Sequence, residues 1–494
     1  MRRKLPIFYS ALMLTGVNLL LRLVSTSFQV YISGLIGAAG VGLLQLVMSV
    51  GSMAMTAGMA GIRTATMYLT AEELGRRKPG NVIWVLSGCF GYSILCSGAV
   101  CLLLQYFAPF LAQNWIGDGR TEGAIRLFAC FVPVSCLCGV MTGYFTAANR
   151  IGTLAAVEVA EQLVSIGVTM TVLSLWAGSD PARACMSVIL GSGISGCLTL
   201  GCLVFLRIRE QVKSSPRIPV RSRLLQTAVP LALADDLKTG INTTENLMVP
   251  KRLALFPGTE DPLAAFGTVC GMVFPVLMFP AAILFGLAEL LIPELARCAA
   301  AGSQKRIRYL VKRSLRVALL YGCLFCGLEF LLATELCATL YGSDEAGIYL
   351  RLYALLIPML YCDAITDAMT KGLGQQKACV RYNIITSAMD VVLLFLLLPK
   401  YGMMGYFFSF LVTHLLNFIL SLGRLLKIVG KVFSPGVLLL AGISTGCAVF
   451  VASHVHQPVL RGCSYILLLG SLLVLLKVVG KEDLTWVKGL VSRK

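Results

Sequence analysis

The sequence has little charge for its length. Only 13% of its 494 residues are Asp, Glu, Lys or Arg, while 57% are hydrophobic, and the mean hydropathy is +0.82. A water-soluble globule usually has about 25% charged residues, most of them on its surface. The composition therefore argues against a soluble enzyme or nucleic-acid-binding protein and predicts a polytopic membrane protein.

The sequence also lacks the motifs of an enzyme. It has no glycine-rich phosphate-binding loop to power transport with ATP, and no Ser/His/Asp or Cys/His arrangement in a water-facing domain. Most of the 18 cysteines lie inside apolar runs, where Cys behaves as a small hydrophobe. The closest pairs, Cys136/Cys138 and Cys323/Cys326, have no His or second Cys pair nearby to complete a zinc site. We therefore expect no enzyme activity, no metal and no other cofactor.

Long apolar runs dominate the sequence. A helix that crosses a bilayer needs about 20 mostly apolar residues, and fourteen runs qualify. They cover residues 6–33, 40–69, 82–106, 124–147, 153–177, 184–206, 224–249, 263–296, 317–334, 347–370, 379–399, 402–423, 433–453 and 463–480. The runs 40–69 and 263–296 exceed one bilayer thickness and should tilt or kink, and Pro275, Pro280 and Pro293 favour a kink in the latter.

The basic residues are unequally divided between the two sides of these spans. With a cytoplasmic N-terminus, most of the 42 Lys and Arg residues fall in cytoplasmic segments. The outer loops hold only Arg120, Arg183, Lys251, Arg252, Lys400 and Arg461. This asymmetry is typical of membrane-protein loops, and it explains the net charge of +18 without a nucleic-acid partner. We expect a multi-pass plasma-membrane protein with both termini cytoplasmic.

Landmarks in the spans recur at a constant displacement of 225 residues. The pairs are Gly42 and Gly267, Gly61 and Gly286, and Pro133 and Pro358. Their agreement predicts an internal duplication in which spans 1–6 and 7–12 have the same orientation and are related by an axis along the membrane normal. Repeats of this kind flank a central substrate site and rock against each other. Spans 13 and 14 fall outside the duplication.

The predicted fold is an all-α membrane protein in which two six-helix repeats form a V-shaped bundle with two extra C-terminal helices. Its parts are an N-terminal half (1–206), a basic cytoplasmic linker (207–223), a C-terminal half (224–428), and helices 13 and 14 with a tail (429–494). We interpret the linker as a tether attracted to anionic lipid rather than a regulatory segment. We expect the halves to enclose a cavity open to one side, with spans 1 and 7 facing each other across it and spans 13 and 14 outside it.

Span 1 has polar side chains along one face. Asn18, Arg22, Ser25 and Gln29 recur every three or four residues. A charge at bilayer depth is costly, and a seam between helices needs only uncharged polar groups. We therefore interpret this face as a cavity wall, with Arg22 as the anchor for an anionic headgroup.

Span 7 is the most polar span. Its Asp235, Lys238, Asn242 and Glu245 share a face, although Asp235 and Lys238 are also spaced for a structural ion pair. Arg63 in span 2 is equally open between a snorkelling surface cation and a cavity-lining one. These five residues and Asn18, Arg22 and Gln29 are the candidate substrate-binding residues.

Other polar residues in the spans have simpler interpretations. Glu158 and Glu161 lie near the predicted start of span 5, where acids complement the helix dipole. Asp367 and Lys371 have the spacing of an ordinary i,i+4 ion pair. His414 stands alone among Leu and Phe and is interpreted as a core residue.

Several segments resemble the stage V sporulation protein B branch of the MOP (multidrug/oligosaccharidyl-lipid/polysaccharide) exporter superfamily. They are LLLRLVSTSFQVYISGLIGAAGVGLLQL after span 1 begins, PVSCLCGVMTGYFTAANR and AAVEVAEQLVSI in spans 4 and 5, and IPMLYCDAITDAMTKGLGQQKACVRYNI and LLPKYGMMGYFFS in spans 10 to 12. The resemblance extends over about residues 7–480, and its best match is in spans 10 to 12.

The resemblance implies a transporter that flips a lipid-linked saccharide precursor by alternating access, for this branch a precursor of peptidoglycan or spore cortex. Arg22 falls where the family has an Arg in helix 1. A second family Arg is replaced by Gln29, and Arg63 stands where the family commonly has Pro in a Gly-x-Pro motif. The implied partners are the lipid-linked oligosaccharide, membrane lipids and, as candidates, cell-wall synthesis enzymes.

Two other functions compete with this one. A cation-coupled exporter of the multidrug and toxin extrusion type is the main alternative, but that group resembles twelve spans and often has an acid in its first helix. Residues 5–33 contain no Asp or Glu. A non-transporting scaffold for cell-wall enzymes is the third hypothesis, and membrane-embedded Arg22 and Asp235 argue against it.

Overall fold

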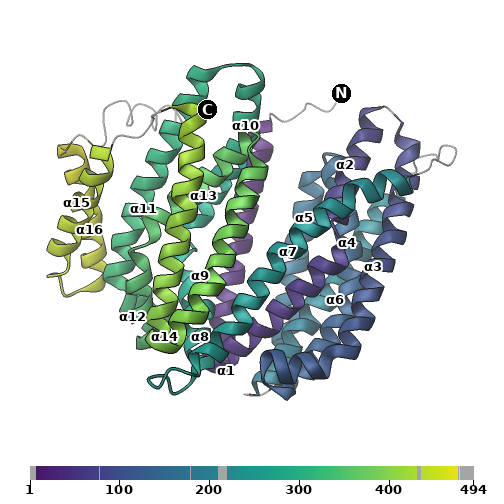
Figure 1. The fold of residues 1–494 in the computed structure, drawn as a ribbon, viewed down its shortest axis with the longest axis horizontal. Helices are drawn as coiled ribbons and strands as arrows, with labels where there is room; N and C mark the ends of the chain where they lie inside the picture. Colours follow the sequence, from purple (N-terminus) through teal and green to yellow (C-terminus); the bar gives the residue numbers. More distant parts are fainter. Residues whose placement is uncertain are drawn as a thin grey trace. The chain divides into compact units, whose positions relative to one another are not determined.

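The structure is a computed structural model that describes residues 7–76, 78–177, 180–209, 220–430, 435–476 and 478. Throughout these residues the regular elements are helices, without a strand (Figure 1). In chain order, with η for short 3-10 or π segments, they are α1 (Ile7–Met59), α2 (Ile62–Gly75), η1 (Pro79–Asn81), α3 (Val82–Phe110), η2 (Leu111–Ile116), η3 (Gly119–Thr121), α4 (Glu122–Ala147), α5 (Ile151–Val172), η4 (Leu173–Ala177), α6 (Pro181–Ile208), α7 (Arg221–Leu253), α8 (Pro262–Gly267), η5 (Thr268–Val273), α9 (Phe274–Leu277), α10 (Ala281–Ala300), α11 (Gln304–Tyr341), α12 (Asp344–Ala354), α13 (Ile357–Gly372), α14 (Gln376–Val429), α15 (Pro435–Ala452) and α16 (Pro458–Leu475).

The two longest helices each contain two membrane spans. α1 has 53 residues, which at 1.5 Å per residue is about 80 Å and more than twice the thickness of a bilayer core. It is interrupted at Gly37, whose φ of 68° and ψ of 177° are not helical. α14, with 54 residues, is interrupted in the same way at Gly402, where φ is 57°. Glycine adopts positive φ without steric cost, so each helix turns back at these points.

The helical segments account for the predicted spans. By length and apolar composition, eight stretches of the described residues can cross a membrane, and two bent pairs can each form one more. Two of the eight stretches, Leu19–Gly75 and Gln376–Val429, each contain two spans. The remaining two spans are α15, a shorter apolar helix, and α7, which is long enough to cross a membrane but contains more charged and polar residues than the other spans. The protein is therefore an all-α, multi-pass membrane protein, and each of the fourteen predicted runs coincides with a helical segment.

Both overlong runs are broken, as predicted. Span 2 is interrupted between α1 and α2 at Ala60 and Gly61, which have φ of 43° and 70°. Span 8 bends by 64° between Leu277 and Ala281. Pro280 lies in this bend, immediately before α10, where its ring cannot continue the preceding helix.

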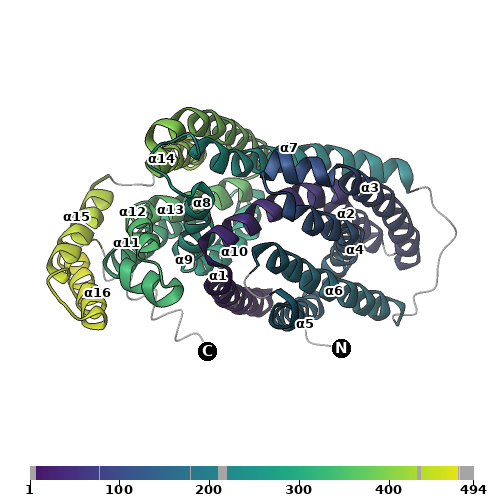
Figure 2. The ribbon, with the colours of Figure 1, turned by 90° about the horizontal axis from the view of Figure 1, so that it is seen from below.

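The chain forms two compact units. The first contains Met1–Gly267 and Leu394–Gly402, and the second contains Thr268–Leu393 and Met403–Lys494. In the first unit, α7 packs on α1 and α2, and α8 packs on α1. In the second, α15 and α16 lie side by side against α11 (Figures 1 and 2). These are units of packing, and the predicted boundaries of the two halves and the linker stay a prediction.

Helix ends also recur at the displacement found in the sequence. Ends or starts 225 residues apart are Ile116 and Tyr341, Ala147 and Gly372, and Ile151 and Gln376. The recurrence joins segments whose local sequences differ, so it supports the duplication independently of the glycine and proline landmarks.

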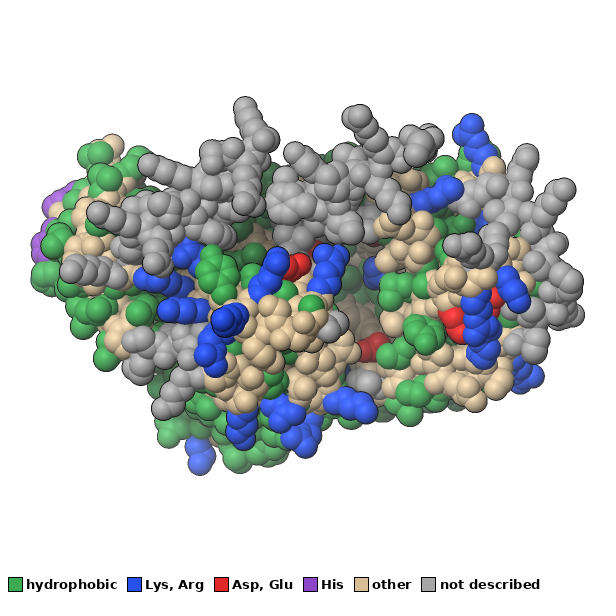
Figure 3. Space-filling model, turned by 90° about the horizontal axis from the view of Figure 1, so that it is seen from above, with side chains coloured by type: hydrophobic (Ala, Val, Ile, Leu, Met, Phe, Trp, Pro, Cys, Tyr) green, Lys and Arg blue, Asp and Glu red, His purple; other side chains and the backbone are tan. Residues whose placement is uncertain are grey.

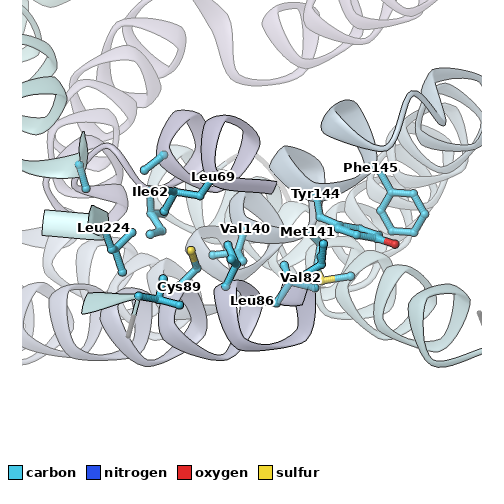
Figure 4. Close-up of a cluster of buried hydrophobic side chains, with 14 of the residues drawn as sticks. Ile62, Leu69, Val82, Leu86, Cys89, Val140, Met141, Tyr144, Phe145 and Leu224 are labelled. Atoms are coloured by element: carbon cyan, nitrogen blue, oxygen red, sulfur yellow. The ribbon is translucent and has the colours of Figure 1, made fainter. Parts of the chain in front are cut away.

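A buried apolar cluster forms the core of the first unit. It joins Ile62 and Leu69 of α2, Val82 and Cys89 of α3, and side chains of α4 (Figure 4). Leu224, from the start of α7, belongs to the same cluster. The first helix of the predicted C-terminal half therefore contributes to the core of the unit that contains the first six spans.

Candidate functional site

The polar face of span 1 lies on the first part of α1. Arg22 and Gln29 are half-buried and Ser25 is exposed. Neither Arg22 nor Gln29 is without a partner. The side chain of Asn18 lies outside the described residues. The structure therefore keeps a cation at membrane depth on α1, in a position where part of the side chain is accessible.

The predicted face of α7 is accessible as a whole. Asp235, Lys238 and Asn242 are exposed and Glu245 is half-buried. Among the described ion pairs, none joins Asp235 to Lys238, so the structural pair that their spacing allowed is not formed. Their role in substrate binding stays a prediction.

Two other polar residues of α7 hold the helix against span 2. The hydroxyl of Thr243 donates to the carbonyl oxygen of Ser49 at 3.1 Å, and the amide of Asn246 donates to the Ser49 hydroxyl at 3.0 Å. Ser49 belongs to the part of α1 that follows the break at Gly37. Span 7 thus lies along span 2 in the first unit and does not make these contacts with span 1.

Arg63 lies on α2, just beyond the break in span 2. Its side chain is exposed, while its backbone is close to α4, because a Cβ atom on Gly143 would come within 2.5 Å of the Arg63 carbonyl oxygen. The guanidinium also interacts electrostatically with Glu158 of α5. Arg63 is therefore within electrostatic range of an acid on a neighbouring helix.

The interpretation of Glu158 and Glu161 as first-turn acids is wrong. α5 begins at Ile151, so both residues lie beyond the first turn, where the helix dipole has little effect. Both are half-buried, and Glu161 is hydrogen-bonded to Thr199 of α6. Asn149, with a φ of 57°, marks the turn before α5, and this residue type, which tolerates positive φ, could have located the helix start.

Asp236 of α7 is a residue that the sequence analysis did not single out. Its Oδ1 atom is buried without a hydrogen-bond partner among the described residues. It interacts electrostatically with Tyr92 of α3, whose hydroxyl donates to the carbonyl oxygen of Ala60 at 3.3 Å. Asp236 therefore lies near the break in span 2.

The second unit buries acids of its own. Asp390 accepts hydrogen bonds from the hydroxyls of Ser409 at 2.5 Å and Thr413 at 3.3 Å, and Asp363 accepts from the amide of Asn417 at 3.2 Å. These pairs join residues far apart in the sequence, so no local spacing pointed to them.

Two smaller predictions for the second unit are confirmed. The ion pair of Asp367 and Lys371 forms at 2.6 Å. His414 packs against the ring of Phe410 at 4.1 Å between centroids, as a core residue would.

The sequence is similar to those of several known proteins. Residues 256–396 match the MatE family model. Stage V sporulation protein B of Bacillus subtilis is 24% identical over 418 residues, which are 80% of this chain and 78% of that protein. Sporulation protein YkvU of the same organism is 21% identical over 282 residues, 54% of this chain and 61% of that protein.

Solved structures with the same architecture include a lipid II flippase, MurJ, in an inward closed conformation. Its TM-score is 0.70 at 15% identity, with coverage of 93% of this chain and 98% of that chain. An inward-facing multidrug resistance MATE family transporter of the MOP superfamily has a TM-score of 0.67 at 13% identity and covers 84% of this chain and 100% of that chain. The chain has the MOP-superfamily fold. The resemblance expected from the sequence is confirmed, and the relatives of this fold are transporters and flippases rather than enzymes.

One face of the molecule is rich in basic side chains. The face in Figure 3 shows many Lys and Arg side chains and few acids. At the start of α11, Lys305, Arg306 and Arg308 are exposed. Which side of the membrane this face meets stays a prediction of the positive-inside pattern.

Proposed function

We propose that the protein is a flippase that moves a saccharide linked to polyprenyl diphosphate, a precursor of peptidoglycan or spore cortex, across the plasma membrane by alternating access. In this proposal both termini are cytoplasmic, and the substrate enters from the membrane in which it is made. Cell-wall synthesis enzymes are candidate partners because they make and consume such precursors.

The main support is the similarity to the lipid II flippase over 93% of this chain, against 84% for the multidrug transporter. The sequence similarity to stage V sporulation protein B agrees with a precursor of the spore envelope. The first span supports the same choice, because it has Arg22 and no acid between residues 5 and 33. A cation there suits an anionic substrate.

The polar residues have complementary roles in this proposal. The guanidinium groups of Arg22 and Arg63 bind diphosphate oxygens, since guanidinium makes two parallel hydrogen bonds to phosphate and stays charged at low dielectric. Asn18 and Gln29 of α1 add hydrogen bonds beside Arg22. On α7 the candidates for contacts with sugar hydroxyls are Asp235, Lys238, Asn242 and Glu245.

Reconstituted protein tests this function against the alternative. Proteoliposomes receive a fluorescent polyprenyl-diphosphate saccharide, and an impermeant quencher reports how much of the headgroup has changed leaflet. We expect flipping by the wild-type protein and none by empty liposomes. The same vesicles, loaded with a cationic dye under a Na⁺ or H⁺ gradient, test drug export. Dye export without headgroup flipping would replace the proposal by the multidrug alternative.

A further inference from the structure

The start of α7 is bound to the end of α2 by a forked ion pair. The two terminal nitrogens of Arg223 lie 2.5 Å from Oε2 of Glu72 and 2.9 Å from Oε1 of Glu73. Glu73 is a buried carboxylate, with 2% of its side chain exposed. It also accepts a hydrogen bond from the amide of Asn81 at 2.8 Å, and Arg76 lies 3.7 Å away. The charge of Glu73 is therefore fully compensated by groups from three segments.

Apolar packing fastens the same turns of α7. Val220, Leu224 and Ala228 are buried in the cluster that contains Ile62 (Figure 4). At Ala228, α7 passes so close to Gly61 that a Cβ atom on Gly61 would lie 2.5 Å from the Ala228 carbonyl oxygen. The contact is possible because Gly61 has no side chain and adopts a φ of 70°.

These attachments bracket the weak point of the helix. Pro230 lies inside α7 and removes one backbone hydrogen bond there. Arg223 holds the helix before the proline, and Leu231 and Ala232, which contact the Gly61 position, hold it afterwards. These contacts therefore fix the rotation of α7 about its axis and its height against α2, and so the position of the polar residues further along the helix.

An ion pair defines this position more sharply than apolar contacts can. Apolar helix faces tolerate small slides, whereas a planar guanidinium that contacts two consecutive carboxylates fits only one register. A buried ion pair adds little stability over apolar packing, and its best-attested benefit is specificity of register. The cluster of Glu72, Glu73 and Arg223 has this property.

We propose that Glu73 and Arg223 are positioning residues for substrate binding. They fix the start of α7 on α2 and thereby set the height and rotation of the face formed by Asp235, Lys238, Asn242 and Glu245. Asp235 begins that face about 18 Å beyond Arg223 along the helix, so neither Glu73 nor Arg223 contacts the headgroup. The inference rests on the proposed function of the α7 face. It adds that this face belongs to the same body as Arg63, so that both keep one geometry throughout the transport cycle.

Flipping kinetics in proteoliposomes test the proposal with Glu73→Gln, Arg223→Gln and the charge exchange that combines Glu73→Arg with Arg223→Glu. We expect each single variant to raise KM for the polyprenyl-diphosphate saccharide about tenfold, with kcat within about twofold of wild type. The charge exchange should return KM to within about threefold of the wild-type value. Arg221→Gln is the matched control, because Arg221 is exposed on the same turn, and its KM should stay within about twofold.

Several outcomes would overturn the proposal. An unchanged KM in both single variants, or a raised KM that the exchange does not lower, would show that the cluster does not position the site. A lower Tm with wild-type KM would show a merely structural role. If the exchange variant does not fold, Arg223→Lys takes its place, and a KM no better than that of Arg223→Gln would count against the proposal.

Hydrogen exchange separates this proposal from the function on which it rests. If the wild-type protein flips no polyprenyl diphosphate, the proposed function fails, and backbone exchange over residues 233–245 decides the positioning role alone. Faster hydrogen exchange over these residues in both single variants, with wild-type hydrogen exchange in the charge-exchange variant, would support the positioning role. Unchanged exchange in the single variants would refute it.

Discussion

Gly42 and Gly267 are in contact, although they lie 225 residues apart in the chain. A Cβ atom on Gly267 would stand 2.6 Å from the backbone nitrogen of Gly42 and 2.0 Å from the carbonyl oxygen of Ala38. A Cβ atom on Gly42 would stand 2.3 Å from the carbonyl oxygen of Leu263. The first landmark pair of the duplication therefore joins α1 and α8 by a backbone contact within the first unit.

Substitution of Gly267 by Ala should destabilise the protein, since the added methyl group meets backbone atoms that cannot rotate away. We expect a loss of about 1–3 kcal/mol, as for other overpacked sites, measured as a lower Tm in detergent. Gly98→Ala is the control, because a Cβ atom there meets nothing within 4 Å. Equal Tm values for the two variants would contradict the close contact.

Arg22 should be required for flipping. We expect Arg22→Ala to abolish headgroup flipping while the protein still inserts and folds, and Arg22→Lys to recover only part of it, because an ammonium group cannot make the two-point contact with phosphate. Flipping in proteoliposomes is measured at equal protein content. Full activity of Arg22→Ala would remove this residue from the proposed site.

Glu158 should weaken substrate binding through its interaction with Arg63. Removal of this counter-charge in Glu158→Gln leaves the guanidinium more attractive to a diphosphate, so KM for the lipid-linked saccharide should fall about threefold to tenfold. Glu161→Gln is the comparison, because Glu161 is engaged with Thr199, and its KM should change less. A KM that rises in Glu158→Gln would show that the acid supports binding instead.

Tyr465 should matter for stability and not for flipping. Its hydroxyl donates to the carbonyl oxygen of Cys323 at 2.7 Å, and its ring packs on Gly327 of α11. Tyr465→Phe should cost about 1 kcal/mol for the lost hydrogen bond, and Gly327→Ala should cost more by displacing the ring. Both should flip at wild-type rates if spans 13 and 14 lie outside the substrate path. Lost flipping at unchanged Tm would place α16 in that path.

The sequence alone predicted much of the fold because membrane spans are local features. A run of about 20 apolar residues must be helical in lipid, so composition located every span without long-range information. Gly61 and Pro280 likewise break helices by their own backbone geometry. The boundaries failed where the chain stays helical between two spans, as at residues 34–39, which the structure includes in α1.

The candidate site was less accessible to sequence reasoning. Helical periodicity correctly grouped the exposed Asp235, Lys238 and Asn242 on one face of α7, because that pattern also is local. It could not show that Arg63 interacts with Glu158, or that Asp390 binds Ser409 and Thr413, since each pair joins different membrane spans. A pairing between helices depends on their rotation and height, which no spacing within one helix contains.

The sequence by itself determined that this is a many-span, all-helical membrane protein with a duplicated interior and a cation in its first span, because apolar length, charge asymmetry and repeated landmarks are written along the chain. The tertiary structure decided what the helices contact. Only folding brings Arg223 to Glu73, which lies 150 residues earlier, and so makes the first helix of the second copy part of the first unit. The reason is physical: an ion pair between distant segments forms only when packing brings the two helices together, and neither residue alone shows which partner it will meet.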